Sequence, residues 1–253
     1  MARLFEAYRA FHEQGFVPIF TEDGFDSRVL VEACLLAGMK GIEYTLRRHD
    51  APEMIPWIRK NFPDLFLLVG STLDDERIVR KMRKKHPQIR TLAEVTLWGV
   101  DGFVSMLGWS VESIRKYSPT HVIAPSAMTV TEALQQTGAG AHFQKLLGPD
   151  VSLVKLCRND ASFDYCPILV TGGQNLERIP QTIDAGAVLV GAGFDLTLKG
   201  LPKDVGAQQV AGILRQYLAV TAEARARKFP QMTAAIGKDR QTWLDALPHY
   251  HTF

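Results

Sequence analysis

Residues 41–70, GIEYTLRRHDAPEMIPWIRKNFPDLFLLVG, contain the strand–helix–strand pattern that decides the fold. Residues 41–46 predict a strand with one polar and one apolar face. Residues 66–70 are apolar throughout, as expected for a strand buried on both faces. Between them, residues 51–62 predict a helix with Pro52 in its first turn. Two strands joined by a helix indicate a parallel β–α–β unit.

The alternation of strands and helices continues along most of the 253 residues. Strands are predicted at residues 17–20, 41–46, 66–70, 102–105, 121–124, 142–147, 168–171 and 187–191. Helices are predicted at residues 26–38, 51–62, 74–86, 111–117, 130–137, 176–185 and 204–228. Eight right-handed β–α units predict an α/β fold, a (β/α)8 TIM barrel in residues 1–228, followed by a C-terminal helical extension in residues 229–253.

Two parts of the chain fit the barrel poorly, and one other fold competes with it. Residues 87–101 are longer than a simple connection, and residues 148–167 are expected to be irregular where a barrel needs a helix. An open doubly wound sheet is the main alternative. It is less favoured because the first β–α turn has no glycine fingerprint. One hypothesis for the extension is that it covers a subunit interface or the barrel mouth.

Composition excludes several classes of protein. The 29 Lys and Arg residues nearly balance the 27 Asp and Glu residues, so the net charge of +2 gives no global attraction to nucleic acid or to an anionic membrane. The basic run in residues 77–85 is best explained as a solvated helix face, with nucleic-acid binding as a weaker alternative. Cys34, Cys157 and Cys166 lack the spacing of a disulfide framework or a zinc site. No signal peptide or membrane span is visible, and a cytoplasmic location is expected.

Two strands place ionisable side chains inside the predicted barrel. Glu43 and Arg47 share the face opposite the apolar face of their strand, so Glu43 is expected to point into the barrel mouth. Lys145 shares the inner face of its strand with Phe143 and Leu147. Burial lowers the pKa of a lysine, and a neutral amine can form a Schiff base with a carbonyl. The alternatives are a structural Glu43–Arg47 ion pair and a lysine that extends into solvent.

Glycines and hydroxyls follow the other strands at their carboxyl ends. Strand seven ends in Thr171, Gly172 and Gly173, and strand eight ends in Gly191-Ala-Gly193. Barrels often bind phosphate with these two loops. Tight turns explain either glycine cluster alone more often than phosphate binding does, but the occurrence of both clusters after these two strands indicates a phosphate site. Thr72 and Ser126 follow strands three and five, where their hydroxyls could hold a carboxylate or cap the next helix.

These motifs resemble, in order, those of the 2-keto-3-deoxy-6-phosphogluconate aldolase / 4-hydroxy-2-oxoglutarate aldolase family, the class I barrel aldolases. The similarity spans about residues 10–200. It rests on Val-Pro18-Ile, Ile-Glu43-Tyr-Thr-Leu-Arg47, Gly70-Ser-Thr72, Phe103-Val-Ser105, Pro125-Ser126, Phe143-Gln-Lys145 and Thr171-Gly172-Gly173.

The resemblance implies a role for each matching residue. Lys145 would form an imine with the C2 carbonyl of a 2-oxo acid, and Glu43 would be the general acid/base. Arg47, with Thr72, would hold the carboxylate of the pyruvate portion. The remaining substrate-binding positions would be Pro18, Ser126, Thr171, Gly172, Gly173, Gly191 and Gly193. The implied reaction cleaves or forms a 2-keto-3-deoxy sugar acid, with or without a 6-phosphate, to or from pyruvate and an aldehyde. The resemblance implies a homo-oligomer, commonly a trimer, with no metal and no cofactor.

The chain departs from the family pattern at positions that set specificity. Gly191-Ala-Gly193 replaces Gly-Gly-Ser, and Asp195, a poor neighbour for phosphate, follows two residues later. Lys145-Leu-Leu-Gly148 stands in place of the family's Lys-Phe-Phe-Pro, with Pro149 displaced by one position. Ser105-Met-Leu-Gly108 stands in place of Ser-Pro-Gly, and Arg158-Asn-Asp160 alters the segment that follows the lysine.

Three rival functions stay open beside the Schiff-base aldolase. One is a barrel that binds a 2-oxo acid or a phosphorylated ligand without turnover. The second is a metal-dependent 2-oxo-acid aldolase, although the histidines of the chain, including His249 and His251, show no ligand spacing. The third is a phosphate-binding barrel isomerase.

Overall fold

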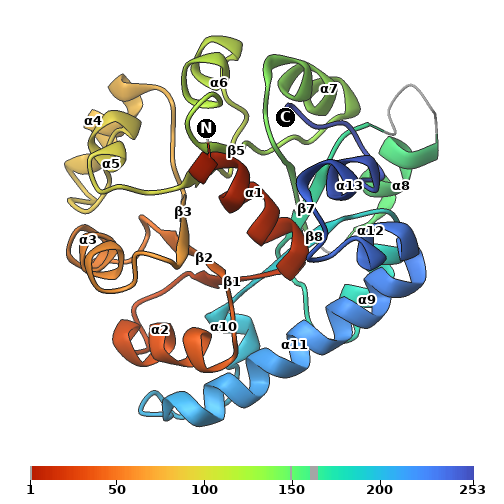
Figure 1. Ribbon diagram of the computed structural model, residues 1–253. Helices are drawn as coiled ribbons and strands as arrows, with labels where there is room; N and C mark the ends of the chain where they lie inside the picture. Colours follow the sequence, from red (N-terminus) through yellow and green to blue (C-terminus); the bar gives the residue numbers. More distant parts are fainter. Residues whose placement is uncertain (1, 149, 160–164) are drawn as a thin grey trace.

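Eight parallel strands form the barrel in the computed structural model, which describes residues 2–148, 150–159 and 165–253 (Figure 1). Their order is β5-β4-β3-β2-β1-β8-β7-β6. The strands are β1 (Phe16–Phe20), β2 (Gly41–Thr45), β3 (Phe66–Gly70), β4 (Gly102–Val104), β5 (Val122–Ala124), β6 (Gln144–Leu147), β7 (Ile168–Thr171) and β8 (Leu189–Gly193). The predicted (β/α)8 barrel is therefore confirmed.

The barrel closes between β5 and β6, at the backbone of Lys145. The Lys145 N–H donates to the Pro125 carbonyl at 2.9 Å, and the Ala127 N–H donates to the Lys145 carbonyl at 2.9 Å. Ser126, between them, forms an isolated parallel bridge with Lys145. These bonds fix the backbone of the lysine on both sides, so its side chain starts from a rigid position.

Helices surround the strands, and α11 packs against α2 and α9 on the outside of the barrel (Figure 1). The helices are α1 (Ala2–Gln14), α2 (Ser27–Leu36), α3 (Ala51–Asn61), α4 (Glu76–Arg83), α5 (Leu92–Thr96), α6 (Val111–Tyr117), α7 (Val130–Ala139), α8 (Ser152–Asn159), α9 (Arg178–Asp184), α10 (Phe194–Thr197), α11 (Ala207–Lys228), α12 (Pro230–Ala234) and α13 (Arg240–Asp245). None of the helices in the described part of the chain is long and apolar enough to cross a membrane.

The two segments that fitted the barrel poorly contain helices. Helix α5 lies within residues 87–101, and its start is a capping box in which Thr91 and Glu94 bond each other's backbone N–H groups. Helix α8 lies within residues 148–167, so the prediction of an irregular stretch was wrong for residues 152–159. Pro149 and Asp160 lie outside the described residues.

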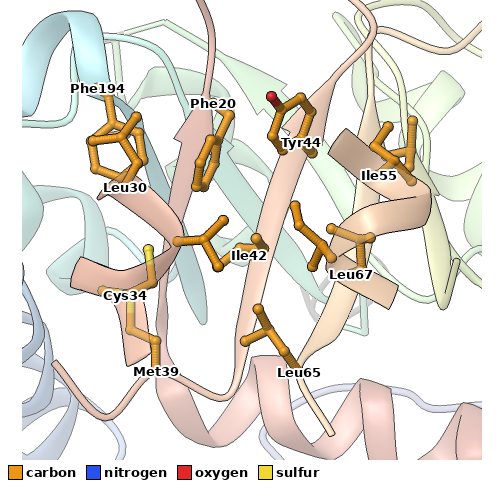
Figure 2. Close-up of a cluster of buried hydrophobic side chains, with 14 of the residues drawn as sticks. Phe20, Leu30, Cys34, Met39, Ile42, Tyr44, Ile55, Leu65, Leu67 and Phe194 are labelled. Carbon is orange, nitrogen blue, oxygen red and sulfur yellow. The ribbon is translucent and has the colours of Figure 1, made fainter. Parts of the chain in front are cut away.

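The outward face of β2 packs under helices α2 and α3, as the alternation predicted. Ile42, Tyr44 and Leu46 have no exposed surface and belong to the largest apolar cluster. Figure 2 shows Ile42 and Tyr44 beside side chains of neighbouring strands and helices, among them Phe20 and Leu67. Burying an aliphatic side chain such as Ile42 or Leu46 stabilises the folded state by about 1.5–3 kcal/mol. Because this set faces outward, Glu43 and Thr45 must face the barrel interior.

Helix α1 and the tail after α11 close the N-terminal end of the barrel. Tyr8 and Phe11 of α1 pack with inward side chains of the strands, and Trp243 of α13 joins the same cluster. The ring of Phe253 lies 5.0 Å from the ring of Tyr8. The hypothesis that the tail covers the barrel mouth was wrong, because these contacts place it at the opposite end, beside α1 (Figure 1).

Candidate active site

A cavity of about 170 Å³ lies at the carboxyl ends of the strands. This end of a barrel carries the functional residues, because its β–α loops converge there. The lining residues are Ile19, Thr21, Glu43, Arg47, Ser71, Met106, Lys145, Leu147, Thr171, Gly172, Gly173, Gly193, Asp195 and Leu196. The cavity therefore brings together the three ionisable residues that the sequence placed inside the barrel.

Lys145 is buried, with 3% of its surface exposed. Its Nζ donates one hydrogen bond, to the Met106 sulfur at 3.4 Å, which is a weak acceptor. Burial lowers the pKa of the amine, and the positive charge of Arg47 lowers it further, while the charge of Glu43 opposes both. The alternative of a lysine that extends into solvent was wrong. The site holds an amine that loses its proton more readily than a free lysine does.

Glu43 is also buried, with 2% of its surface exposed, and its Oε2 has no hydrogen-bond partner among the described residues. Burial raises the pKa of this carboxyl group, against the opposing charges of Lys145 and Arg47. No ion pair within 4.0 Å joins Glu43 to Arg47 or to Lys145 in the described structure. Among the described residues the structural ion pair is thus absent, and Glu43 has an oxygen without a partner and a raised pKa.

Arg47 stands past the end of β2, exposed at the rim of the cavity. Its guanidinium group makes no hydrogen bond or ion pair with the residues that the structure describes. A guanidinium that is free, cationic and planar can bind a carboxylate through two parallel hydrogen bonds. The rim of the cavity can therefore hold an anionic group of a ligand.

Three of the predicted substrate-binding residues do not line the cavity. The Thr72 hydroxyl donates to the Val104 carbonyl at 2.8 Å, so its proton is committed to strand β4. Ser126 is buried, and its hydroxyl has no partner in the described chain. Pro18 lies between Val17 and Ile19, which face the barrel interior, so alternation turns its ring to the helix layer.

Of the residues predicted in the two glycine loops, most line the cavity and one does not. Thr171, Gly172, Gly173 and Gly193 line the cavity, but Gly191 does not. Gly191 pairs with Thr171 and lies two residues before Gly193 along β8. Gly172 and Gly173 have φ angles of 84° and 68°, which glycine adopts without strain. The Thr171 hydroxyl is buried without a partner in the described structure, so it is free to bond a ligand or water.

Several lining residues were not among the predicted site positions. Ser71 has a φ angle of 60°, the one positive value at a residue other than glycine in the described chain. Such strain concentrates at functional sites. Thr21 and Asp195 form a hydrogen bond of 2.6 Å at the opening. The sequence pattern identified Asp195 only as a departure from the family, and nothing in the pattern indicates that Thr21 meets it.

A larger cavity, of about 620 Å³, lies on the outside of the barrel near the first turns of α2 and α3. Its main charges already have protein partners. Arg48 pairs with Asp50 at 2.9 Å, and His49 pairs with Asp23 at 2.5 Å. The smaller cavity is the candidate active site because its amine and carboxyl group are buried and, among the described residues, neither forms an ion pair. The described residues contain no cluster of three or more His, Cys, Asp or Glu that could hold a metal ion.

Neither a family model nor a curated protein matches this chain, but many solved structures resemble it. The 4-hydroxy-2-oxoglutarate aldolase from TTHB1 is 20% identical over 85% of this chain and 98% of its own, with a TM-score of 0.63. KDPG aldolase from Legionella pneumophila, solved with pyruvate captured as a covalent carbinolamine intermediate, is 16% identical over 88% of this chain and 97% of its own, with a TM-score of 0.57.

The same fold also occurs in a different kind of enzyme. Thiamine phosphate pyrophosphorylase from Pyrococcus furiosus is 13% identical over 84% of this chain and 98% of its own, with a TM-score of 0.56. One fold can host unrelated reactions, so the likeness establishes architecture and leaves chemistry to the site. Members of the family that the sequence motifs resemble are nevertheless among the structural neighbours. The chain has the (β/α)8 barrel fold that these aldolases share.

Proposed function

We propose that this protein is a class I aldolase, a lyase that uses a Schiff base to join or separate pyruvate and an aldehyde. The product of the joining direction is a 4-hydroxy-2-oxo acid, the class to which 2-keto-3-deoxy sugar acids belong. The observation that carries the proposal is the buried amine of Lys145, with a lowered pKa, in one cavity with the unpaired carboxyl group of Glu43. A neutral amine next to a proton donor is what imine formation requires.

The reaction begins on the Lys145 nitrogen. The amine attacks the C2 carbonyl of pyruvate to give a carbinolamine, which loses water to form the imine. A proton then leaves C3, and the electron pair of that bond moves toward the imine nitrogen to give an enamine. The enamine carbon attacks the aldehyde carbonyl, so the C3–C4 bond forms and the aldehyde oxygen takes a proton. Water finally hydrolyses the imine, and cleavage follows the same steps in reverse.

Glu43 and Arg47 have distinct roles in this proposal. Glu43 moves the protons, directly or through one water, because its raised pKa suits a group that must both give and accept a proton. Arg47 binds the carboxylate of the pyruvate portion, since it is a cation at the rim without a protein partner among the described residues. The Met106 sulfur orients the lysine amine.

A structural neighbour with covalently captured pyruvate supports Schiff-base chemistry on this fold. The Legionella protein captures pyruvate covalently, and its fold is the fold of this chain. We further propose that residues 1–228 form the catalytic barrel and residues 229–253 an extension, and that the protein is cytoplasmic and forms a homo-oligomer, a trimer as in the resembled family.

Borohydride trapping tests the proposal. The protein is incubated with pyruvate and sodium borohydride, and the intact mass and the peptide with Lys145 are measured. We expect one adduct, with the mass of pyruvate less water plus two hydrogen atoms, on Lys145. It should be absent in Lys145→Met and present in the matched control Lys60→Met, whose lysine is exposed on α3. An adduct on another lysine, or none, would contradict the mechanism and favour a barrel that only binds its ligand.

A metal-dependent aldolase is distinguished by a second measurement. Cleavage that persists after dialysis against EDTA supports the Schiff base. Cleavage that is lost with EDTA and restored by a divalent cation would favour the metal-dependent alternative.

A further inference from the structure

The cavity has an acidic side chain in the place where many barrels bind phosphate. Phosphate in such barrels is held by the loops after strands seven and eight and by the first turn of a short extra helix. In this chain, Gly172 and Gly173 follow β7, Gly193 ends β8, and helix α10 (Phe194–Thr197) begins at the next residue. Asp195 lies in the first turn of that helix and lines the cavity.

A hydrogen bond on one side and the bare backbone of a glycine on the other define the position of the Asp195 carboxylate. Its Oδ1 accepts a hydrogen bond from the Thr21 hydroxyl at 2.6 Å. The same oxygen lies directly over the end of β8, because a Cβ atom on Gly193 would come within 2.0 Å of it. The negative charge of the side chain therefore lies where an anionic ligand would approach the loops after β7 and β8.

Both cationic side chains in the described lining of the cavity have other roles in the proposed reaction, so neither is available to bind a phosphate group. Its cations are Lys145 and Arg47, and its acidic groups are Glu43 and Asp195. In the proposed reaction, Lys145 becomes the imine and Arg47 holds the pyruvate carboxylate. Within the described residues no further Lys or Arg lines the cavity, and residues 1, 149 and 160–164 include neither type. A phosphate dianion at this end would meet a carboxylate without a compensating cation.

We propose that Asp195 is a specificity-determining residue that selects a neutral, hydroxylated aldehyde and disfavours its phosphate ester. The inference rests on the proposed aldolase function. Oδ1 is bonded to Thr21, and the second carboxylate oxygen, which has no hydrogen-bond partner within the described part of the chain, can accept a hydrogen bond from a hydroxyl group of the aldehyde. Asp195 is exposed at the opening, so solvent weakens its repulsion of phosphate. We therefore expect discrimination of about tenfold, which corresponds to about 1.4 kcal/mol.

A pair of aldehydes that differ by one phosphate group tests the proposal. Initial rates of condensation with pyruvate are measured for D-glyceraldehyde and D-glyceraldehyde 3-phosphate. The wild-type protein should have a kcat/KM about tenfold higher for the unphosphorylated aldehyde. Asp195→Asn should remove most of this preference, and high salt should reduce it in the wild type. The matched control Asp64→Asn removes an exposed carboxylate from the opposite end of the barrel and should keep the wild-type ratio.

A binding measurement tests the role of Asp195 without requiring that the protein be an aldolase. Glycerol 3-phosphate is titrated into the wild type, Asp195→Asn and Asp195→Ser by calorimetry, without pyruvate. We expect both variants to bind it about tenfold more tightly than the wild type does. Failure of borohydride trapping would refute the aldolase, and this titration would then decide the role of Asp195 alone. Equal binding by the three proteins, or a wild-type preference for the phosphorylated aldehyde, would overturn the inference.

Discussion

Gly70 and Glu43 share one space inside the barrel: a Cβ atom on Gly70 would lie 2.1 Å from the Glu43 Oε1 and 2.9 Å from its Cδ. Strands β2 and β3 are neighbours, and Gly70 pairs with Thr45, two residues beyond Glu43. The missing side chain on β3 thus leaves room for the carboxylate that β2 presents. The position of the proposed acid/base group depends on a glycine that takes no part in the chemistry.

Gly70→Ala should displace the Glu43 carboxylate and slow the reaction. General acid/base catalysis contributes about 100- to 10,000-fold, and we expect a loss of kcat near the lower end, because the carboxylate moves without being removed. The steady-state rate of cleavage and the rate of pyruvate trapping measure this loss. The matched control is Gly138→Ala in helix α7, where an added Cβ meets no atom within 4 Å. It should leave kcat unchanged and stabilise the helix by about 0.5–1 kcal/mol.

The rate of pyruvate trapping should depend on pH through the amine of Lys145. Its pKa lies below the ordinary 10.5, so the rate should reach its upper limit at a lower pH than for a free lysine. Arg47 lowers this pKa and Glu43 raises it. Arg47→Met should therefore move the midpoint of the profile up, and Glu43→Gln should move it down. Shifts of both variants in the same direction would contradict the charge arrangement of the cavity.

Arg47→Met should weaken the binding of pyruvate. A hydrogen bond to a charged group contributes about 1.5–3 kcal/mol, so the KM for pyruvate should rise about 10- to 100-fold. At saturating pyruvate, the borohydride adduct on Lys145 should still form. Arg47→Lys should retain part of the affinity because it keeps the charge but not the paired hydrogen bonds. Arg80→Met, on the exposed face of α4, is the control and should leave the KM unchanged.

The tail should make stability sensitive to acid through His249. Its Nε2 lies 2.8 Å from the Nε2 of His12, and its Nδ1 donates to the Tyr250 carbonyl. Burial lowers the pKa of His249 to about 3, from an ordinary value of 6.5. Between these values the unfolded chain binds a proton that the folded protein does not, so stability falls as the pH falls below 6.5.

His249→Gln should remove its share of that acid sensitivity. Because this variant removes one buried neutral histidine, the slope of the unfolding free energy against pH should decrease by about 1.4 kcal/mol per pH unit. Urea unfolding at several pH values between about 6.5 and 4 measures the slope. An unchanged slope would show that His249 is not buried in its neutral form. The catalytic rate at pH 7 should not change, because His249 lies at the end of the barrel opposite Lys145.

Much of the barrel could be predicted because its strands obey simple local rules. Alternation along β2 decided which side of the strand faces the helices, so Glu43 could be placed inside from the sequence alone. Lys145 could be placed inside for the same reason, since Phe143 and Leu147, which share its face of the strand, are apolar. Helix α5 was not predicted although its signal was present, because the capping box of Thr91 and Glu94 was not recognised.

Other features could not be predicted because they depend on tertiary contacts. Thr72 follows β3 as predicted, but its hydroxyl bonds to Val104 of the next strand, which only the register of β3 and β4 decides. Gly191 and Gly193 are indistinguishable by sequence pattern, and the stagger of the barrel places only Gly193 at the cavity. The position of the tail depends on the packing of Trp243 and Phe253 against α1, more than two hundred residues away in sequence.

Closure of the N-terminal end by α1 and the tail has a kinetic consequence for the proposed reaction. Both reactants, and the water that hydrolyses the imine, must then reach Lys145 through the cavity at the carboxyl ends of the strands, whose described lining includes Arg47 and Asp195. Lys145 lies at the buried end of that passage, so an aldehyde already at the rim would obstruct pyruvate. The expected scheme is compulsory-order addition, with pyruvate entering first and leaving last.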